Sequence, residues 1–298
     1  MTTTAIDGIL KGAIDVHTHS GPSPMPRQID HVEAARQAAE AGFRAILVKC
    51  HYHSTVTDVL AMGPQLAGIP TQVLGGVALN TVAGGLNLHA VDLAVRLGGR
   101  MVWFPTISAR AHLDHAAHNE NTRSHFTPLG MLPQEPVPVL DEAGDVLPEV
   151  RTILEYTRDA GVAVSMGHLD AASATAVIEA AHELGQRRIL VSHPNYIAGI
   201  DHALAKRLAA LGTVFDQPIA MYDKLGERTL FPLEDLLAWI DAVGPEHTVL
   251  GSDLGQQGNP LPMEVYRSIV PRLLDAGVGE ADLRLMLAMN PARLLGLD

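Results

Sequence analysis

Short runs of apolar, often β-branched residues recur along the chain, and each run closely follows a glycine. The eight glycines are Gly12, Gly42, Gly68, Gly98, Gly161, Gly185, Gly212 and Gly244. Before most of them, apolar residues recur at spacings of three and four, which predicts amphipathic helices. A glycine just after such a stretch is typical of the left-handed residue that ends a helix. The pattern therefore predicts a strand and a helix in alternation, repeated eight times.

Eight units of strand and helix close most naturally into an α/β (β/α)8 TIM-type barrel, because right-handed crossovers keep the strands parallel and adjacent. An open doubly wound sheet is the alternative, but no G-x-G-x-x-G sequence opens the first helix. The number of residues between Gly98 and Gly161 is about twice the number between the other neighbouring glycines of this series. We therefore expect one domain over residues 1–298, with a long insertion after strand four at about residues 107–148. Such a loop is typical of a lid or substrate clamp, and we expect its histidines, His112 among them, to be solvated.

Histidines and acids fall where the predicted strands end. Asp15, His17 and His19 alternate along strand one, a spacing that puts three side chains on one face of a strand. Equivalent strand ends carry His168 after strand five, His193 after strand six and Asp253 after strand eight. Active sites of barrels lie at the carboxyl ends of the strands, and imidazole and carboxylate ligands suit Zn²⁺, Mn²⁺ or Fe²⁺. We predict a divalent metal site there, with zinc preferred, and with Asp15 orienting the two histidines of strand one.

With these residues in this order, the sequence resembles the amidohydrolase superfamily of metal-dependent hydrolases over essentially the whole chain. Its final stretch, GEADLRLMLAMNPARLLGL, also resembles the closing helix pair of that superfamily. The resemblance implies a distorted barrel that holds one or two divalent metals. The implied ligands are His17, His19, His168, His193 and Asp253.

The sequence departs from this superfamily at strand four. Members with two metals usually carry a bridging lysine or glutamate there, but the strand reads RMVWFPTI. Lys49, near the end of strand two and on the same face as His51, is the candidate replacement. Burial favours a neutral amine, which reacts with CO₂ or accepts a proton. The alternatives are a charged Lys49 that binds a substrate carboxylate or an oxyanion, and a structural lysine; the empty strand-four position favours a single metal.

The predicted function is hydrolysis of an amide, cyclic amide or lactone bond in a small, carboxylate-bearing molecule. Asp253 is expected to take the proton from the attacking water and give it to the leaving group, while His193 binds a second metal or polarises the carbonyl. The candidate substrate-binding residues are His51, Trp103, Arg110 and Arg123. A metal-dependent decarboxylase or hydratase of a small acid, a phosphoesterase, and a barrel that only binds a ligand are the alternatives.

Composition narrows the partners and the compartment. The net charge of −12 argues against nucleic acid and anionic membranes, and no stretch reaches the roughly 20 apolar residues of a membrane span. Cys50 is the only cysteine, and the first residues lack the basic start and apolar run of a signal peptide. We therefore expect a cytoplasmic homo-oligomer that acts on a small molecule.

Overall fold

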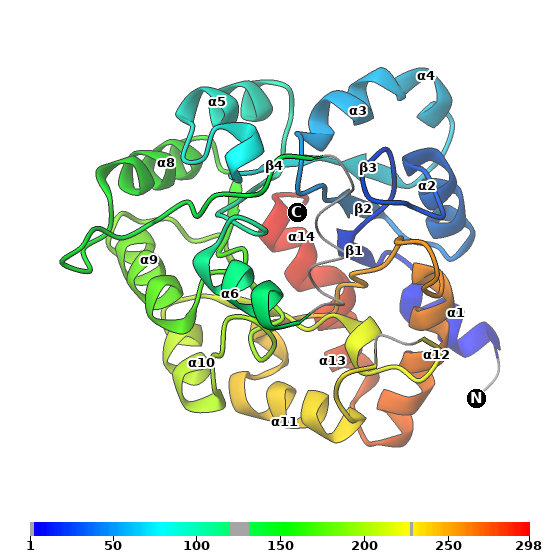
Figure 1. The fold of residues 1–298 in the computed structure, drawn as a ribbon. Helices are drawn as coiled ribbons and strands as arrows, with labels where there is room; N and C mark the ends of the chain where they lie inside the picture. The colour runs from blue at the N-terminus through cyan, green and yellow to red at the C-terminus, as the bar shows by residue number, and fades with distance from the viewer. Residues whose placement is uncertain (1–2, 120–130, 227–228) are drawn as a thin grey trace.

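A computed structural model describes residues 3–119, 131–226 and 229–298, with parallel strands at the centre and helices around them (Figure 1). The strands are β1 (Ile14–Thr18), β2 (Ala45–Val48), β3 (Gln72–Leu74), β4 (Gly76–Ala78), β5 (Met101–Trp103), β6 (Ala163–Ser165), β7 (Ile189–Ser192), β8 (Val214–Asp216) and β9 (Thr248–Val249). The helices are α1 (Thr3–Leu10), α2 (His31–Glu40), α3 (Thr55–Ala61), α4 (Gly63–Leu66), α5 (Leu88–Arg96), α6 (Arg110–His118), α8 (Pro148–Asp159), α9 (Ala171–Glu183), α10 (His202–Ala209), α11 (Leu233–Val243), α12 (Pro262–Asp275), α13 (Glu280–Arg284) and α14 (Asn290–Leu295). Short 3₁₀ turns lie at Thr81–Ala83, Ile219–Met221 and Pro245–His247, and a π-helical turn lies at Leu285–Met289.

The strands form two parallel sheets that together make a barrel. One sheet has the order β1-β2-β3, and the other runs from β4 to β9 in sequence order. β3 and β4 are two parts of the third strand, separated by Gly75, where a Cβ atom would lie 2.7 Å from the backbone of α3. At the other seam, the His19 amide donates to the Leu254 carbonyl and the Asp253 amide donates to the His17 carbonyl, both at 2.7 Å. The predicted (β/α)8 TIM-type barrel is confirmed.

Local sequence sets both ends of the helices. The eight glycines that follow predicted helices all have positive φ angles, between 65° and 93°, which only glycine adopts at little cost. At the opposite ends, Asp30, Asp170 and Asp201 begin α2, α9 and α10, and their carboxylates accept backbone amides of the first turn. Such caps satisfy amides that have no partner within the helix. The repeated pattern in the sequence therefore marks real helix boundaries.

The two halves of the barrel interior differ in chemistry. The half at the amino ends of the strands is filled by apolar side chains of the strands and of α14, among them Ile14, Leu47, Met101, Trp103, Leu190, Val249 and Leu294. The half at the carboxyl ends buries polar side chains, including His17, His19, Lys49, His168 and His193. Buried polar groups are costly unless they are paired. This end of the barrel therefore has the chemical groups of a functional site.

The insertion after strand four lies between β5 and α8, as predicted. It contains α6, a helix that the sequence pattern did not predict, which lies toward the viewer in Figure 1. Further along the insertion, the Val137 amide donates to the Ser108 carbonyl at 2.9 Å, and the Thr81 hydroxyl donates to the Glu135 carbonyl at 2.7 Å. The described part of the insertion therefore packs against the barrel.

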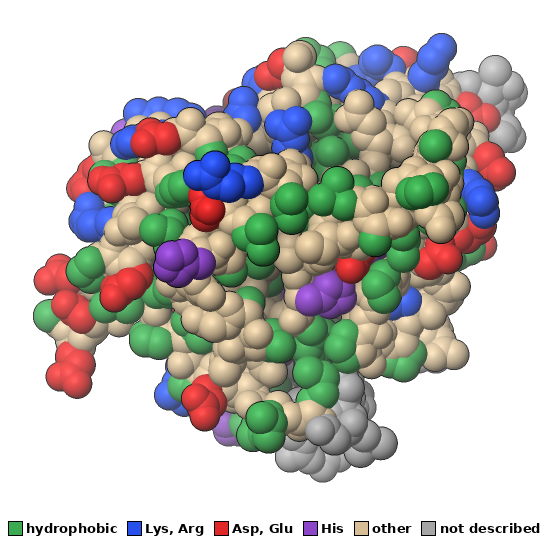
Figure 2. Space-filling model, turned by 90° about the horizontal axis from the view of Figure 1, so that it is seen from above, with side chains coloured by type: hydrophobic (Ala, Val, Ile, Leu, Met, Phe, Trp, Pro, Cys, Tyr) green, Lys and Arg blue, Asp and Glu red, His purple; other side chains and the backbone are tan. Residues whose placement is uncertain are grey.

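The surface carries charges of both signs. On the face drawn in Figure 2, basic and acidic side chains are interspersed, with apolar side chains between them. The net charge of −12 is thus not gathered into one patch on this face. Within the described ranges, every helix is too short or too polar to cross a membrane.

Candidate metal centre

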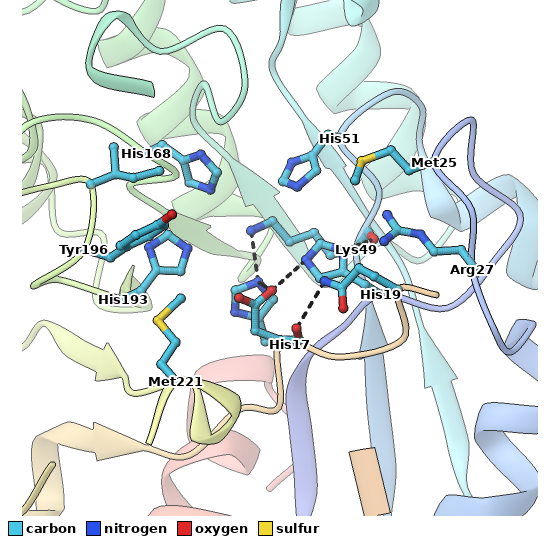
Figure 3. Close-up of a pocket in the computed structure, with 13 residues that line it drawn as sticks. His17, His19, Met25, Arg27, Lys49, His51, His168, His193, Tyr196 and Met221 are labelled. Carbon is cyan, nitrogen blue, oxygen red and sulfur yellow. Dashed lines mark hydrogen bonds and ion pairs between the residues drawn. The ribbon is translucent and has the colours of Figure 1, made fainter. Parts of the chain in front are cut away.

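A cavity opens at the carboxyl ends of the strands (Figure 3). Its lining includes His17, His19, Lys49, His51, His168, His193 and Asp253. The five imidazoles form a closed circuit in which neighbouring ring centroids are 5.0–5.8 Å apart. The barrel thus brings together side chains from β1 and from the segments after β2, β6, β7 and β9.

His17, in β1, and His19, just after it, reach the cavity, but Asp15 does not. The pairing of β1 with β2 shifts register between Asp15 and Thr18, because β1 has one extra residue in this stretch. Such a bulge reverses the alternation of faces along a strand. Asp15 instead accepts the amides of His17 and Ser252, at 3.0 and 2.9 Å. The expectation that Asp15 shares a face with the two histidines is wrong; it holds the backbone that carries His17.

Asp253 lies against both His17 and His19. Its Oδ1 atom is 3.1 Å from His19 Nε2 and 3.4 Å from His17 Nε2. One ligand atom from each of the three lies within 4.8 Å of the others, so this buried group could hold a metal ion. Among the described residues, only Asp253 and His193 combine a side chain with a left-handed φ, of 55° and 38°. Such backbone strain persists where the surroundings fix it, and it clusters at functional sites.

Four of the imidazoles are held at Nδ1 by a group outside the cavity. His17 Nδ1 is 2.7 Å from Asp216 Oδ2, His19 Nδ1 is 3.0 Å from the Lys49 carbonyl, His51 Nδ1 is 2.8 Å from the Thr106 hydroxyl and His168 Nδ1 is 2.9 Å from His112 Nδ1. A carboxylate or carbonyl partner accepts the Nδ1–H and leaves the Nε2 lone pair for a metal. Outer partners of this kind are typical of metal-binding histidines.

Burial favours the neutral form of His19, His51, His168 and His112. It lowers the pKa of His19, His51 and His168 well below the usual value, and it lowers the pKa of His112 to about 4. For His19, burial outweighs the hydrogen bond with Asp253, which favours the charged form. Neutral imidazole is the form that binds a metal. The donor set therefore fits a divalent cation such as Zn²⁺.

Lys49 is enclosed by the circuit of imidazoles. It is 1% exposed, and its Nζ atom is 3.1 Å from His17 Nε2 and 5.9 Å from the centre of the Trp103 ring. The residues that alternate with it along β2, Ala45 and Leu47, point into the barrel interior. The amine is therefore within reach of a metal ligand and of any molecule in the cavity.

The predicted substrate-binding residues do not all reach the cavity. His51 lines it, whereas Trp103 fills the barrel below Lys49, among apolar side chains. Arg110 is the first residue of α6 and is exposed. The placement of Trp103 and Arg110 in the cavity wall is therefore corrected, because one points down into the core and the other out to solvent. Arg123 lies outside the described residues.

Other residues at the centre were not predicted. His112, expected to be solvated, is buried, and its ring stacks on that of His168 with centroids 4.9 Å apart. Asp216 ends β8, and the FDQP sequence could have marked it by the same strand-end rule that found the histidines. Arg27 and Tyr196 also line the cavity, but they lie in loops that have no periodic pattern.

The parallel barrel, with imidazoles and a carboxylate at the carboxyl ends of its strands, places this chain in the broad class of barrels that can bind a metal. Within it, the chain belongs to the family described as "Family of unknown function (DUF6282)", whose model matches residues 12–216. A comparison with curated proteins finds no match.

Solved structures share the fold at low sequence identity. An amidohydrolase from Pseudomonas aeruginosa has a TM-score of 0.64 and 14% identity, and the match covers 99% of this chain and 98% of that one. A putative 2-pyrone-4,6-dicarboxylic acid hydrolase from Pseudomonas putida has a TM-score of 0.59 and 16% identity, with 96% and 98% covered. A 2,6-dihydroxybenzoate decarboxylase in complex with 2,6-dihydroxybenzoate has a TM-score of 0.55 and 12% identity, with 96% and 99% covered. The resemblance to the amidohydrolase superfamily is confirmed at the level of the fold.

Proposed function

We propose that this chain is a metal-dependent hydrolase that cleaves an amide, cyclic amide or lactone bond in a small, carboxylate-bearing molecule. The main support is the circuit of imidazoles, four of them anchored at Nδ1, around a cavity that also contains Asp253. Fold neighbours described as an amidohydrolase and as a putative 2-pyrone-4,6-dicarboxylic acid hydrolase add to it. Zinc and a cytoplasmic location are part of the proposal.

His17, His19 and Asp253 would hold the metal, because their ligand atoms already lie close together. This set holds one metal; if a second is bound, His168 and His193 would be its ligands and a carbamate on Lys49 would take the place of the missing strand-four bridge. A divalent metal bound here polarises a carbonyl group and lowers the pKa of water to about 7.

The chain's own residues then carry the proton and position the substrate. Asp253 accepts the proton of the attacking water and donates it to the leaving nitrogen or oxygen. The hydrogen bond of its amide to the His17 carbonyl, 2.7 Å long, keeps this carboxylate at the cavity. With one metal bound, His193 on the cavity wall polarises the substrate carbonyl, and a charged Lys49 stabilises the developing oxyanion.

A decarboxylase or hydratase of a small acid is the second candidate. Thr106, just after β5, offers no bridging carboxylate; its hydroxyl instead contacts His51 Nδ1 and accepts a hydrogen bond from Asn80. A single metal therefore suits this end of the barrel, and a decarboxylase is among the proteins that share the fold.

The test begins with metal analysis of protein purified without chelators. The metal-loaded protein is then offered lactones, cyclic imides, amides, a phosphate monoester and a small carboxylic acid, and the products are identified by mass spectrometry. If the protein is a hydrolase, water is added to a lactone, a cyclic imide or an amide. This activity should disappear when the metal is removed and return when zinc is added. Release of CO₂ from an acid would favour the second candidate, and protein without affinity for any divalent metal would overturn both.

A further inference from the structure

Arg27 adds a positive charge to the cavity that the proposed metal and proton chemistry does not use. It lies in the loop between β1 and α2, and in Figure 3 its side chain points from that loop toward His19 and Met25. All three guanidinium nitrogens are shielded from solvent. Because Arg27 lines the same cavity as Asp253, its charge acts on any molecule that occupies this cavity.

The backbone of Arg27 is tied to the segment that follows Asp253. Arg27 and Gln256 form an antiparallel bridge, and further backbone hydrogen bonds of 3.0 and 3.1 Å flank it. The Gln256 side chain in turn donates to the Asp253 carbonyl at 3.1 Å. Arg27 and the proposed catalytic carboxylate therefore belong to one hydrogen-bonded unit. A substrate group bound by Arg27 is held at a fixed position relative to Asp253, which is how enzymes align reacting groups.

The charge of the occupied cavity favours an anion. Arg27 and Lys49 are the basic side chains in its described lining, and Asp253 is the acidic one. One divalent metal beside a charged Lys49 leaves an excess of positive charge. Two metals bridged by a Lys49 carbamate do so as well, because the second metal outweighs the anionic bridge. In a chain whose net charge is −12, this local excess selects small anions.

The shape of the remaining wall suits a small organic body. Met25, Ile197 and Met221 contribute apolar surface, and a planar guanidinium presents two N–H donors that match the two oxygens of a carboxylate. We infer that Arg27 binds a carboxylate group of the substrate and so makes the enzyme selective for anionic amides or lactones over their uncharged analogues. This inference rests on the proposed function, which it makes more specific.

Binding of two matched probes tests the inference without relying on turnover. Succinate and its uncharged analogue succinamide are titrated into the zinc-loaded protein by calorimetry. We expect succinate to bind the natural protein at least about 10-fold more tightly. Arg27→Met should weaken succinate binding by about 10-fold to 100-fold, the range for hydrogen bonds to charged groups, and should leave succinamide binding unchanged. Arg27→Lys keeps the charge but loses the planar pair of donors, so its affinity for succinate should lie between those of the natural protein and Arg27→Met.

Arg36→Met is the matched control, because Arg36 lies on α2 with 59% of its side chain exposed. It should bind both probes as the natural protein does, and all variants should retain their zinc. Equal binding of the two probes by the natural protein would overturn the inference without any variant. So would unchanged succinate binding in a zinc-loaded Arg27→Met. If succinate is preferred but no amide, imide or lactone is hydrolysed, the proposed function fails and the anion site remains.

Discussion

The two sides of the cavity are built in different ways. On one side, His17, His19 and Asp253 come from β1 and the segment after β9, which are joined by backbone hydrogen bonds across the barrel seam. On the other side, His168 and His193 follow β6 and β7, and their ring centroids are 5.0 Å apart. The first side is assembled by the barrel itself.

The second side depends on an addition to the barrel. His168 is held through its Nδ1 atom by His112, which belongs to α6 in the insertion. The first side could therefore hold the proposed metal without a contribution from the insertion, whereas the second can be adjusted by changes in the insertion. Substitutions on the two sides should differ in kind: loss of the two histidines on the first side should remove metal, and substitutions on the second side should alter turnover.

The largest effect is expected from the double variant His17→Ala/His19→Ala. Both changes remove ligands from the preassembled side, so bound metal and activity should be lost together, by more than the roughly 10–100-fold that loss of an outer partner costs. Elemental analysis and a rate measurement on the same sample check this. His89→Ala on the exposed face of α5 is the control. A double variant with full metal content would refute the assignment of this side.

Asp253→Asn should reduce kcat by at least about 100-fold, the scale of a lost general base. Asparagine tolerates the left-handed backbone that Asp253 adopts, with a φ of 55°, so the fold should be kept. Metal content should fall less than in the double histidine variant, because His17 and His19 remain. A rate near that of the natural protein would assign the base to another group.

The variant Lys49→Met distinguishes a site that holds one metal from a site that holds two. We expect about one metal per chain before and after the change, with activity reduced about 100-fold or more because an oxyanion loses its stabilising charge. Methionine fills most of the space of this buried side chain, which limits loss of stability. Two metals in the natural protein, fewer in the variant and partial recovery with added acetate would instead identify a carbamate bridge. Normal activity would leave Lys49 with a structural role.

The sequence could predict the barrel and much of the cavity, because both follow from local patterns. Helix ends are marked by glycines, and parallel strands in a barrel bring their carboxyl ends together whatever lies between them. His17, His168, His193 and Asp253 could therefore be brought together from their positions at strand ends alone. Lys49 followed from simple alternation along β2.

The remaining features depend on contacts that no local pattern encodes. The position of Asp15 is set by a bulge that arises where β1 pairs with β2. His112 reaches His168 only because the insertion folds back over the barrel. Arg27 enters the cavity because its loop pairs with the segment at Gln256. Each of these requires the tertiary structure.

His112→Phe should leave the preassembled side intact and weaken the other side. Phenylalanine keeps the stacked ring but removes the nitrogen that contacts His168 Nδ1 at 2.9 Å. Loss of such an outer partner typically costs 10–100-fold, so kcat/KM should fall by about that amount while one metal stays bound. His112→Asn, which restores a polar partner, should recover part of the activity. His118→Phe on the exposed part of the same helix is the control; equal rates in the two phenylalanine variants would remove His112 from the site.

The smallest effect is expected at Arg110, which the sequence alone suggested as a substrate residue. It is the exposed first residue of α6 and does not line the cavity. Arg110→Met should therefore change KM for an anionic substrate less than about twofold. Arg27→Met, by contrast, should raise the same KM about 10-fold or more. A cation at the start of a helix is slightly unfavourable to the helix dipole, so thermal unfolding should show a free-energy change within about 0.5 kcal/mol, if anything toward greater stability. The informative measurement is KM for a charged substrate and for its carboxamide in both variants. A rise in KM confined to the charged substrate in Arg110→Met would mean that α6 moves its first residue over the cavity when substrate binds, and that both arginines act on the substrate.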